Sequence, residues 1–406
     1  MPETELRREL GLFEVTLYGV GLILGAGIYT VIGEAAGMAG ESLPLAFLLS
    51  ALIAAFTGLS YAELSTMFPE EGAEYVYTLK AFGSEKLSSF VAIMRILVGV
   101  ISGAAVSLAF ASYLSSLVPI PLTITAIALI VVASCINFYG IKLSADFNVL
   151  FTIVEILGLI IIIALGLLNW NGINVTQFPQ NFKGLFNGAF LVFFAYIGFQ
   201  SLVNISEETR DAKKTIPRAM ILSIVITTGL YIAVAACTLT LANWQALAES
   251  SAPLAFAAAE AMGPKAFFIL TVIALFSTTN TVLISLISSS RMLYGSAKKR
   301  YTFPEIFSKV HSVTRTPYFA VLGVMLISIA FALIGDISIV ANITNFGLLS
   351  VFVIINLSLI WIKLKKPNIE SSFSSPLDYN GFPVTSIMGM VTSFLFVLFY
   401  LIRNFI

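Results

Sequence analysis

The chain of 406 residues is 58% hydrophobic and only 11% charged, with 22 Lys and Arg residues against 22 Asp and Glu residues. A soluble domain carries about 25% charged residues, so this composition excludes an ordinary cytosolic enzyme and a disordered protein. The balanced charge offers no positive field to nucleic acid, and two Cys with one His argue against a metal centre. We therefore expect a polytopic helical membrane protein that uses neither a nucleic-acid partner nor a cofactor.

Long apolar segments recur along the chain, and a membrane-spanning helix needs about 20 such residues. The sequence predicts eleven spans, at 14–38, 43–67, 86–115, 121–138, 145–169, 186–206, 217–241, 265–296, 318–335, 339–362 and 383–402. Mostly short loops connect them, as a compact all-α bundle in a lipid bilayer requires.

The distribution of Lys and Arg predicts the orientation, because cytoplasmic loops carry an excess of these residues. With the N-terminus inside, 18 of the 22 Lys and Arg residues lie on the cytoplasmic side and three lie outside. The remaining one, Arg95, falls inside the third span. We expect a multi-pass protein of the cell membrane whose N-terminal segment, residues 1–13, is cytoplasmic.

Glycines interrupt two of the predicted spans. The first span contains Gly25-Ala26-Gly27, and the sixth contains Gly198 within a run of aromatic residues. Spans five apart run in opposite directions, and glycine breaks at matching places in two halves indicate inverted repeats with a binding site near the midplane. The predicted repeats are 14–169 and 186–362, and 383–406 is an addition.

A break inside a membrane helix has a specific chemical meaning. It frees backbone N–H and C=O groups that lipid cannot satisfy. The N-terminus of a half-helix favours an anion, whereas freed carbonyls favour a cation. A zwitterion with a carboxylate and an ammonium on adjacent carbons matches both. The alternative is that the glycines serve only close packing of helices.

Four groups of motifs follow one another over most of residues 14–320. They are G-A-G-I at 25–28; YAEL and EYVY within 61–77; FAYIGF, EE and IPRA within 194–219; and R-x-x-Y at 291–294 with FP and TP at 303–304 and 316–317. In this order they resemble the amino acid–polyamine–organocation (APC) superfamily of permeases. The resemblance implies a LeuT-like fold of five plus five inverted-repeat helices with discontinuous helices 1 and 6. It also implies alternating access and an α-amino acid substrate.

The resemblance also implies a substrate site made of backbone groups at the two breaks and two aromatic side chains. Its carboxylate end falls on Gly25, Ala26 and Gly27, its ammonium end on the carbonyls of Phe194, Ala195 and Ile197, and its aromatic side chains are Tyr196 and Phe199. The alternative for the two aromatic side chains is ordinary helix packing.

The fifth span departs from the family pattern. Many proton-coupled relatives resemble T-x-x-K there, but this chain has Thr152 followed by Glu155, so the charge is reversed. Glu155 lies near the midplane of its span, where ionisable residues are usually functional. We hypothesise that it is the proton-coupling carboxylate. The alternatives are a Na⁺ ligand, a partner for a cationic substrate, or an ion pair with Arg95 at a similar depth.

The eighth span carries a stripe of hydroxyl groups. Ser277, Thr281, Ser285 and Ser288 share one helix face by their spacing. A stripe that faces the first span would suit an ion or water path, and interhelical hydrogen bonding is the alternative. Ser277 and Thr281 are the candidate ion-coupling residues on this span.

These observations predict a secondary active transporter rather than an enzyme, since the sequence shows no nucleophile–base pair. The predicted activity is proton-coupled import of neutral amino acids, because the pocket residues are apolar or aromatic. Two alternatives stay open at this point. One is an amino acid exchanger without ion coupling, and the other is a permease for cationic amino acids or polyamines. In both, Glu155 is structural or a substrate ligand.

Overall fold

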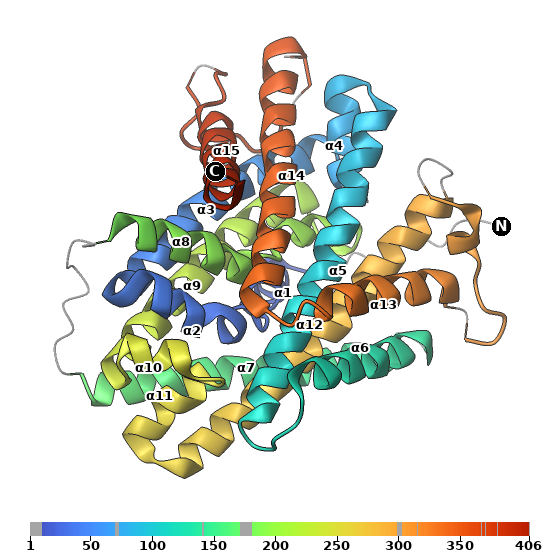
Figure 1. Ribbon diagram of the computed structural model, residues 1–406. Coiled ribbons are helices and arrows are strands. Elements are labelled where there is room, and N and C mark those ends of the chain that lie inside the picture. The colour runs from blue at the N-terminus through green and yellow to red at the C-terminus, as the bar shows by residue number, and fades with distance from the viewer. Residues whose placement is uncertain are drawn as a thin grey trace.

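The computed structural model describes residues 10–69, 73–139, 142–170, 181–298, 303–314, 316–366, 368–369, 371–379 and 381–405. This part of the chain is a bundle of helices and contains no strand (Figure 1). The all-α membrane fold is therefore confirmed. Residues 1–9, most of the predicted N-terminal segment, lie outside the described residues.

Each of the eleven predicted spans is helical. Nine correspond to one helix each: α3 (Leu43–Met67), α5 (Glu85–Ser115), α6 (Leu122–Tyr139), α7 (Lys142–Leu168), α9 (Ala212–Leu241), α12 (Pro264–Lys298), α13 (Tyr318–Ala332), α14 (Ile337–Lys365) and α15 (Val384–Phe405). The first and sixth are divided, into α1 (Leu12–Leu24) with α2 (Gly27–Ala39), and into α8 (Phe182–Val192), η2 (Phe193–Tyr196) and η3 (Phe199–Glu208).

Several short helices lie in the connections between the predicted spans. They are η1 (Gly40–Ser42), α4 (Ala73–Phe82), α10 (Trp244–Glu249), α11 (Pro253–Met262) and η4 (Glu305–Ser308). By length and composition, nine helical segments among the described residues can cross a membrane, with α2, η1 and α3 counted as one segment. The shorter apolar helices α1, α11 and α13 fall below that length.

Side-chain caps fix where several helices begin. The side chain of Ser84 accepts a hydrogen bond from the backbone N–H of Leu87 at the start of α5. The side chain of Asp336 does the same for Ile339 at the start of α14. Such caps satisfy N–H groups that have no partner within the helix, so they set the boundary where a span begins.

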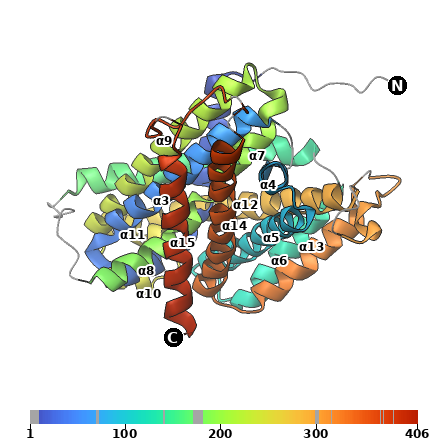
Figure 2. The ribbon, with the colours of Figure 1, turned by 90° about the horizontal axis from the view of Figure 1, so that it is seen from above.

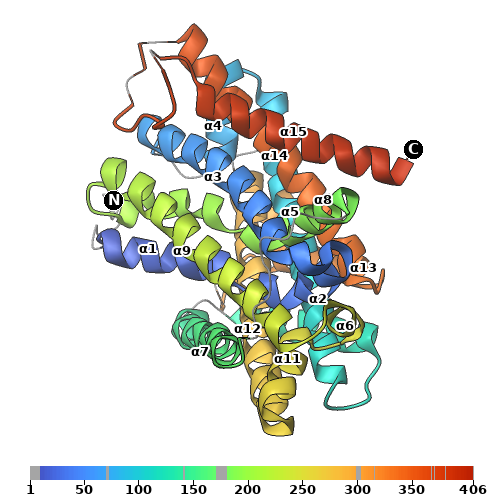
Figure 3. The same cartoon turned by 90° about the vertical axis from the view of Figure 1, so that its left-hand side faces the viewer.

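The two divided spans pack against each other, α2 on α8, and against long helices of the bundle. Helix α1 lies alongside α9 (Figure 3), and α9 also packs along α3. Helix α5 packs against both α12 and α14, while α7 packs against α12 and α9. Helices α14 and α15 run side by side (Figure 2), and α15 also contacts α3.

Candidate functional site

The first divided span breaks at Gly25 and Ala26. Helix α1 ends at Leu24, Gly25 has φ 17° and ψ −176°, and α2 begins at Gly27. The freed backbone N–H of Ala26 donates to Oγ1 of Thr281 on α12 at 2.9 Å. A hydroxyl from a neighbouring span thus satisfies one of the groups that the break releases, as a low-dielectric environment demands.

The second divided span breaks at Ile197 and Gly198. The 3-10 helix η2 ends at Tyr196, Ile197 is extended, and Gly198 has φ 138° before η3 begins. The backbone N–H of Gly198 donates to Oε1 of Gln200 at 3.0 Å. Both predicted breaks are therefore present, each at the glycine-containing stretch that suggested it.

The two breaks touch each other, and glycine is what allows the contact. A Cβ added to Gly27 would lie 2.6 Å from Cα of Ala195. A Cβ added to Gly198 would lie 2.2 Å from the backbone oxygen of Leu22. The first half of each divided span therefore meets the break of the other, which brings their freed backbone groups into one small region.

Tyr231 of α9 joins the two breaks. Its hydroxyl lies 2.8 Å from the carbonyl oxygen of Ile23, 3.0 Å from that of Leu24 and 2.9 Å from that of Ala195. The side chain is fully buried. One O–H donates to one acceptor at a time. The hydroxyl of Tyr231 is therefore within hydrogen-bond distance of carbonyls from both divided spans and can donate to any one of them. Sequence reasoning missed this residue, although a tyrosine in an otherwise apolar span was the available signal.

We expect Tyr231→Phe to loosen the contact between the two breaks. The change removes the donor and leaves buried carbonyls unsatisfied, which costs about 1–3 kcal/mol. Substrate uptake and the Tm of the purified protein should both fall. Tyr113→Phe is the matched control, because it deletes one 3.3 Å hydrogen bond to the backbone of Tyr29. Equal effects of the two changes would contradict a special role for Tyr231.

Glu155 lies on α7 and is buried. Its Oε1 accepts a hydrogen bond from Oγ of Ser277 on α12 at 2.7 Å. Its backbone oxygen accepts one from the hydroxyl of Tyr29 on α2 at 3.1 Å. Ser277 and Thr281 thus connect α12 to Glu155 and to the first break, respectively. This arrangement places the carboxyl beside the divided span α1–α2.

Arg95, the alternative partner of Glu155, lies elsewhere. Its Nε forms an ion pair with Oε1 of Glu74 at 3.1 Å, and its Nη2 donates to Oγ of Ser201 at 2.9 Å. Among the ion pairs of the described residues, none involves Glu155. Equal depth in two spans does not determine which way each side chain faces, and here Arg95 faces α4 and η3.

The hydroxyl stripe of α12 does not continue toward the first span. The Cβ of Ser285 lies beside Gly103 of α5, and Ser288 is exposed. The helix therefore presents Ser277 to Glu155 and Thr281 to the first break, whereas Ser285 lies against α5 and Ser288 is exposed.

Tyr196 and Phe199 are both buried in helix contacts. The hydroxyl of Tyr196 donates to the backbone oxygen of Phe47 on α3 at 3.1 Å. The ring of Phe199 packs edge-on against Tyr61 and lies beside Phe352. The ring of Tyr196 also packs edge-on against Tyr231, so both side chains make packing contacts within the bundle.

Residues 10–406 match the family described as amino acid permease. The chain belongs to this family. Its relatives are transporters, not enzymes. It is 29% identical to the branched-chain amino acid permease BcaP of Bacillus subtilis, over 99% of this chain and 89% of that one. It is 29% identical to the methylthioribose transporter of Bacillus subtilis, over 91% and 84%, and to human cationic amino acid transporter 4, over 94% and 64%.

Membership of the family places the chain in the APC superfamily and confirms the resemblance that its motifs suggested. The fold is accordingly the LeuT-like all-α membrane fold with discontinuous first and sixth spans. The protein is a multi-pass membrane permease with a small-molecule substrate. Among the described residues, no group of three His, Cys, Asp or Glu side chains could hold a metal ion.

Proposed function

We propose that this permease imports neutral α-amino acids by alternating access, coupled to the inward movement of protons. The observation that carries the proposal is the buried carboxyl of Glu155, held by Ser277 beside the break in α1–α2. A carboxyl in this position can hold a proton while the site faces one side of the membrane and release it on the other. In this proposal the substrate binds at the break in α1–α2, next to Glu155.

The substrate binds to backbone groups of both breaks in this proposal. Its carboxylate accepts hydrogen bonds from the backbone of Gly25, Ala26 and Gly27 at the N-terminus of α2, where the helix dipole favours negative charge. The N–H of Ala26 exchanges its hydrogen bond to Thr281 for one to the carboxylate. Its ammonium donates to the carbonyls of Phe194, Ala195 and Ile197. The contact of Gly27 with Ala195 supports this assignment, because it holds the two sets of backbone groups together.

A neutral side chain is the preferred cargo because aromatic and aliphatic residues surround the second break. Phe194 and Ala195 are buried beside Ile197. The relationship to a branched-chain amino acid permease is in keeping with this preference.

The relationship to a cationic amino acid transporter favours a second candidate, in which Glu155 neutralises a positively charged substrate. A third candidate is Na⁺ coupling through Glu155, Ser277 and Thr281.

We also propose the orientation and the repeat structure. The N-terminus is cytoplasmic and the protein resides in the cell membrane, which the excess of Lys and Arg in the predicted cytoplasmic loops supports. Residues 14–169 and 186–362 form the two inverted repeats, and 383–406 is an addition. The equivalent places of the two breaks, each in the first span of its repeat, support this division.

Uptake by reconstituted protein tests the proposal. Liposomes containing the purified permease receive a panel of labelled amino acids under an inward proton gradient, under a sodium gradient, or with unlabelled amino acid preloaded. We expect accumulation of neutral amino acids under the proton gradient. Accumulation only with sodium would mean that Na⁺ is the coupling ion instead of the proton. Flux only with preloaded substrate would mean that the protein is an exchanger. Preference for lysine or arginine would favour the cationic alternative.

A further inference from the structure

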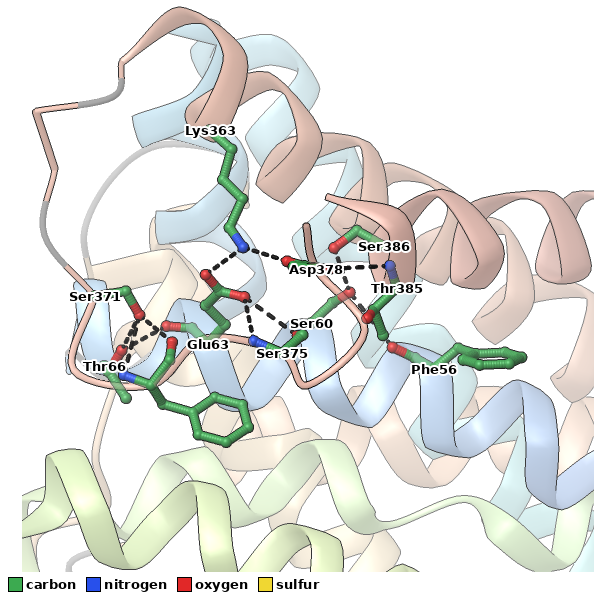
Figure 4. Close-up of polar contacts among 11 residues, drawn as sticks. Phe56, Ser60, Glu63, Thr66, Lys363, Ser371, Ser375, Asp378, Thr385 and Ser386 are labelled. Atoms are coloured by element: carbon green, nitrogen blue, oxygen red, sulfur yellow. Dashed lines mark hydrogen bonds and ion pairs between the residues drawn. The ribbon is translucent and has the colours of Figure 1, made fainter. Parts of the chain in front are cut away.

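A cluster of buried polar contacts joins α3, α14 and the segment that leads into α15 (Figure 4). Nζ of Lys363 lies 2.6 Å from Oε1 of Glu63 and forms a second ion pair with Asp378. Oε2 of Glu63 accepts hydrogen bonds from the backbone N–H and the hydroxyl of Ser375. We name the cluster the Glu63 seam, and it comprises Ser60, Glu63, Lys363, Ser375, Asp378 and Ser386.

A neutral contact extends the seam into α15. The hydroxyl of Ser60 donates to that of Ser386 at 3.0 Å, and both side chains are fully buried. Figure 4 shows this pair beside Asp378, whose Oδ1 accepts from the backbone N–H of Thr385. The seam therefore binds three helices together through several contacts at once.

The Arg95 network is another buried charged contact among the described residues, and its partner Ser201 lies between the break at Gly198 and the predicted cytoplasmic end of the sixth span. The guanidinium bridges Glu74 of α4 and Ser201 of η3, and the hydroxyl of Tyr61 on α3 donates to the same Glu74 oxygen at 3.3 Å. Ser201 follows the break at Gly198 by three residues. Arg95 thus holds the second half of the sixth span against α5.

The Glu63 seam and the contact between Arg95 and Ser201 differ in which groups would lose their partners if the contact opened. Opening the Glu63 seam would leave the carboxylate of Glu63 or Asp378 buried without its partner Lys363. An unpaired buried charge is strongly unfavourable. Opening the contact between Arg95 and Ser201 breaks one hydrogen bond and leaves a neutral hydroxyl. Arg95 keeps Glu74 throughout, so its charge stays paired.

We propose that Arg95 is a positioning residue that clamps η3 to α5, and that its hydrogen bond to Ser201 breaks when the substrate site opens to the cytoplasm. The Glu63 seam stays intact during this step, so α3, α14 and α15 remain joined. The assignment of this side as cytoplasmic rests on the proposed function. Release of η3 changes access to the second break without separating any buried ion pair.

Alkylation of a reporter cysteine tests the clamp. Ser206→Cys is introduced on η3, where Ser206 is 7% exposed, in a chain with Cys135→Ala and Cys237→Ala. The protein is placed in lipid nanodiscs, where both faces meet a hydrophilic maleimide. We expect Ser201→Ala to speed alkylation roughly ten-fold, because a hydrogen bond from a charged donor is lost. Ser60→Ala is the matched control and should label at the parent rate.

A second variant keeps the test independent of folding defects. Arg95→Lys preserves the positive charge beside Glu74. It lacks the second guanidinium nitrogen that donates to Ser201, so it should also accelerate alkylation. Labelling of Ser201→Ala at the parent rate would overturn the proposal, as would equal acceleration by Ser60→Ala. The measurement uses neither substrate nor an ion gradient. Its outcome is therefore separate from that of the uptake assay.

Discussion

Replacement of Glu155 by Gln is expected to abolish proton-driven accumulation while leaving one-for-one exchange of substrate. The amide is nearly the same shape as the carboxyl, and its oxygen can still accept the 2.7 Å hydrogen bond from Ser277. The fold should therefore persist. The amide cannot take up a proton, so an inward proton gradient no longer drives the transport cycle. Uptake by the parent should rise as the external solution is acidified, and uptake by the variant should be independent of pH.

The measurement compares labelled neutral amino acid in liposomes under a proton gradient and with preloaded substrate. Glu260→Gln makes the same chemical change at an exposed position on α11 and serves as the control. Its accumulation should equal that of the parent. Accumulation by Glu155→Gln that keeps its pH dependence would show that another group carries the proton. Loss of both accumulation and exchange would assign Glu155 to substrate binding instead.

Replacement of Gly198 by Ala should abolish transport and lower the Tm of the protein. Gly198 has φ 138°, a backbone conformation that other residues rarely adopt, and holding Ala there costs about 1–3 kcal/mol. The added Cβ would also lie 2.2 Å from the backbone oxygen of Leu22. Backbone cannot yield as a flexible side chain can, so α1 must separate from the sixth span.

Gly263→Ala separates the two causes of that effect. Gly263 also has a positive φ, 76°, but no atom lies within 4 Å of a Cβ built there. The control should therefore show a modest loss of stability and normal uptake. The thermal stability of the purified proteins and uptake into liposomes provide the comparison. Normal transport by Gly198→Ala would contradict the close contact between the two divided spans.

The membrane explains why the spans could be predicted from sequence. Lipid offers no hydrogen bonds, so each crossing must be a long apolar helix, and the predicted bounds of α3 and α5 agree with the structure to within one residue. The same constraint makes interruptions recognisable in the sequence, because a break in a membrane helix frees backbone groups that lipid cannot satisfy. The breaks at Gly25 and Gly198 were predicted on that basis. The short helices α4, α10 and α11 lie outside this constraint, and their sequences carried no comparable signal.

Side-chain partners were harder to predict, because depth in the bilayer does not determine direction around a helix. Glu155 and Ser277 were both candidates for ion coupling, and the structure brings them together. Arg95 lies in a span that was predicted to cross the membrane in the same direction as that of Glu155, yet it faces Glu74. Tyr231 stood out only as a tyrosine in an otherwise apolar span, because its role depends on three carbonyls from two distant segments.

Measurement of proton movement is the decisive test of proton-coupled import. A pH-sensitive dye is sealed inside liposomes that contain the permease, and the neutral amino acid identified by the uptake panel is added outside without an imposed gradient. If protons enter with the substrate, the interior acidifies as the substrate enters, and Glu155→Gln shows no acidification. Entry of labelled substrate into the parent liposomes with no change in internal pH would contradict proton-coupled import.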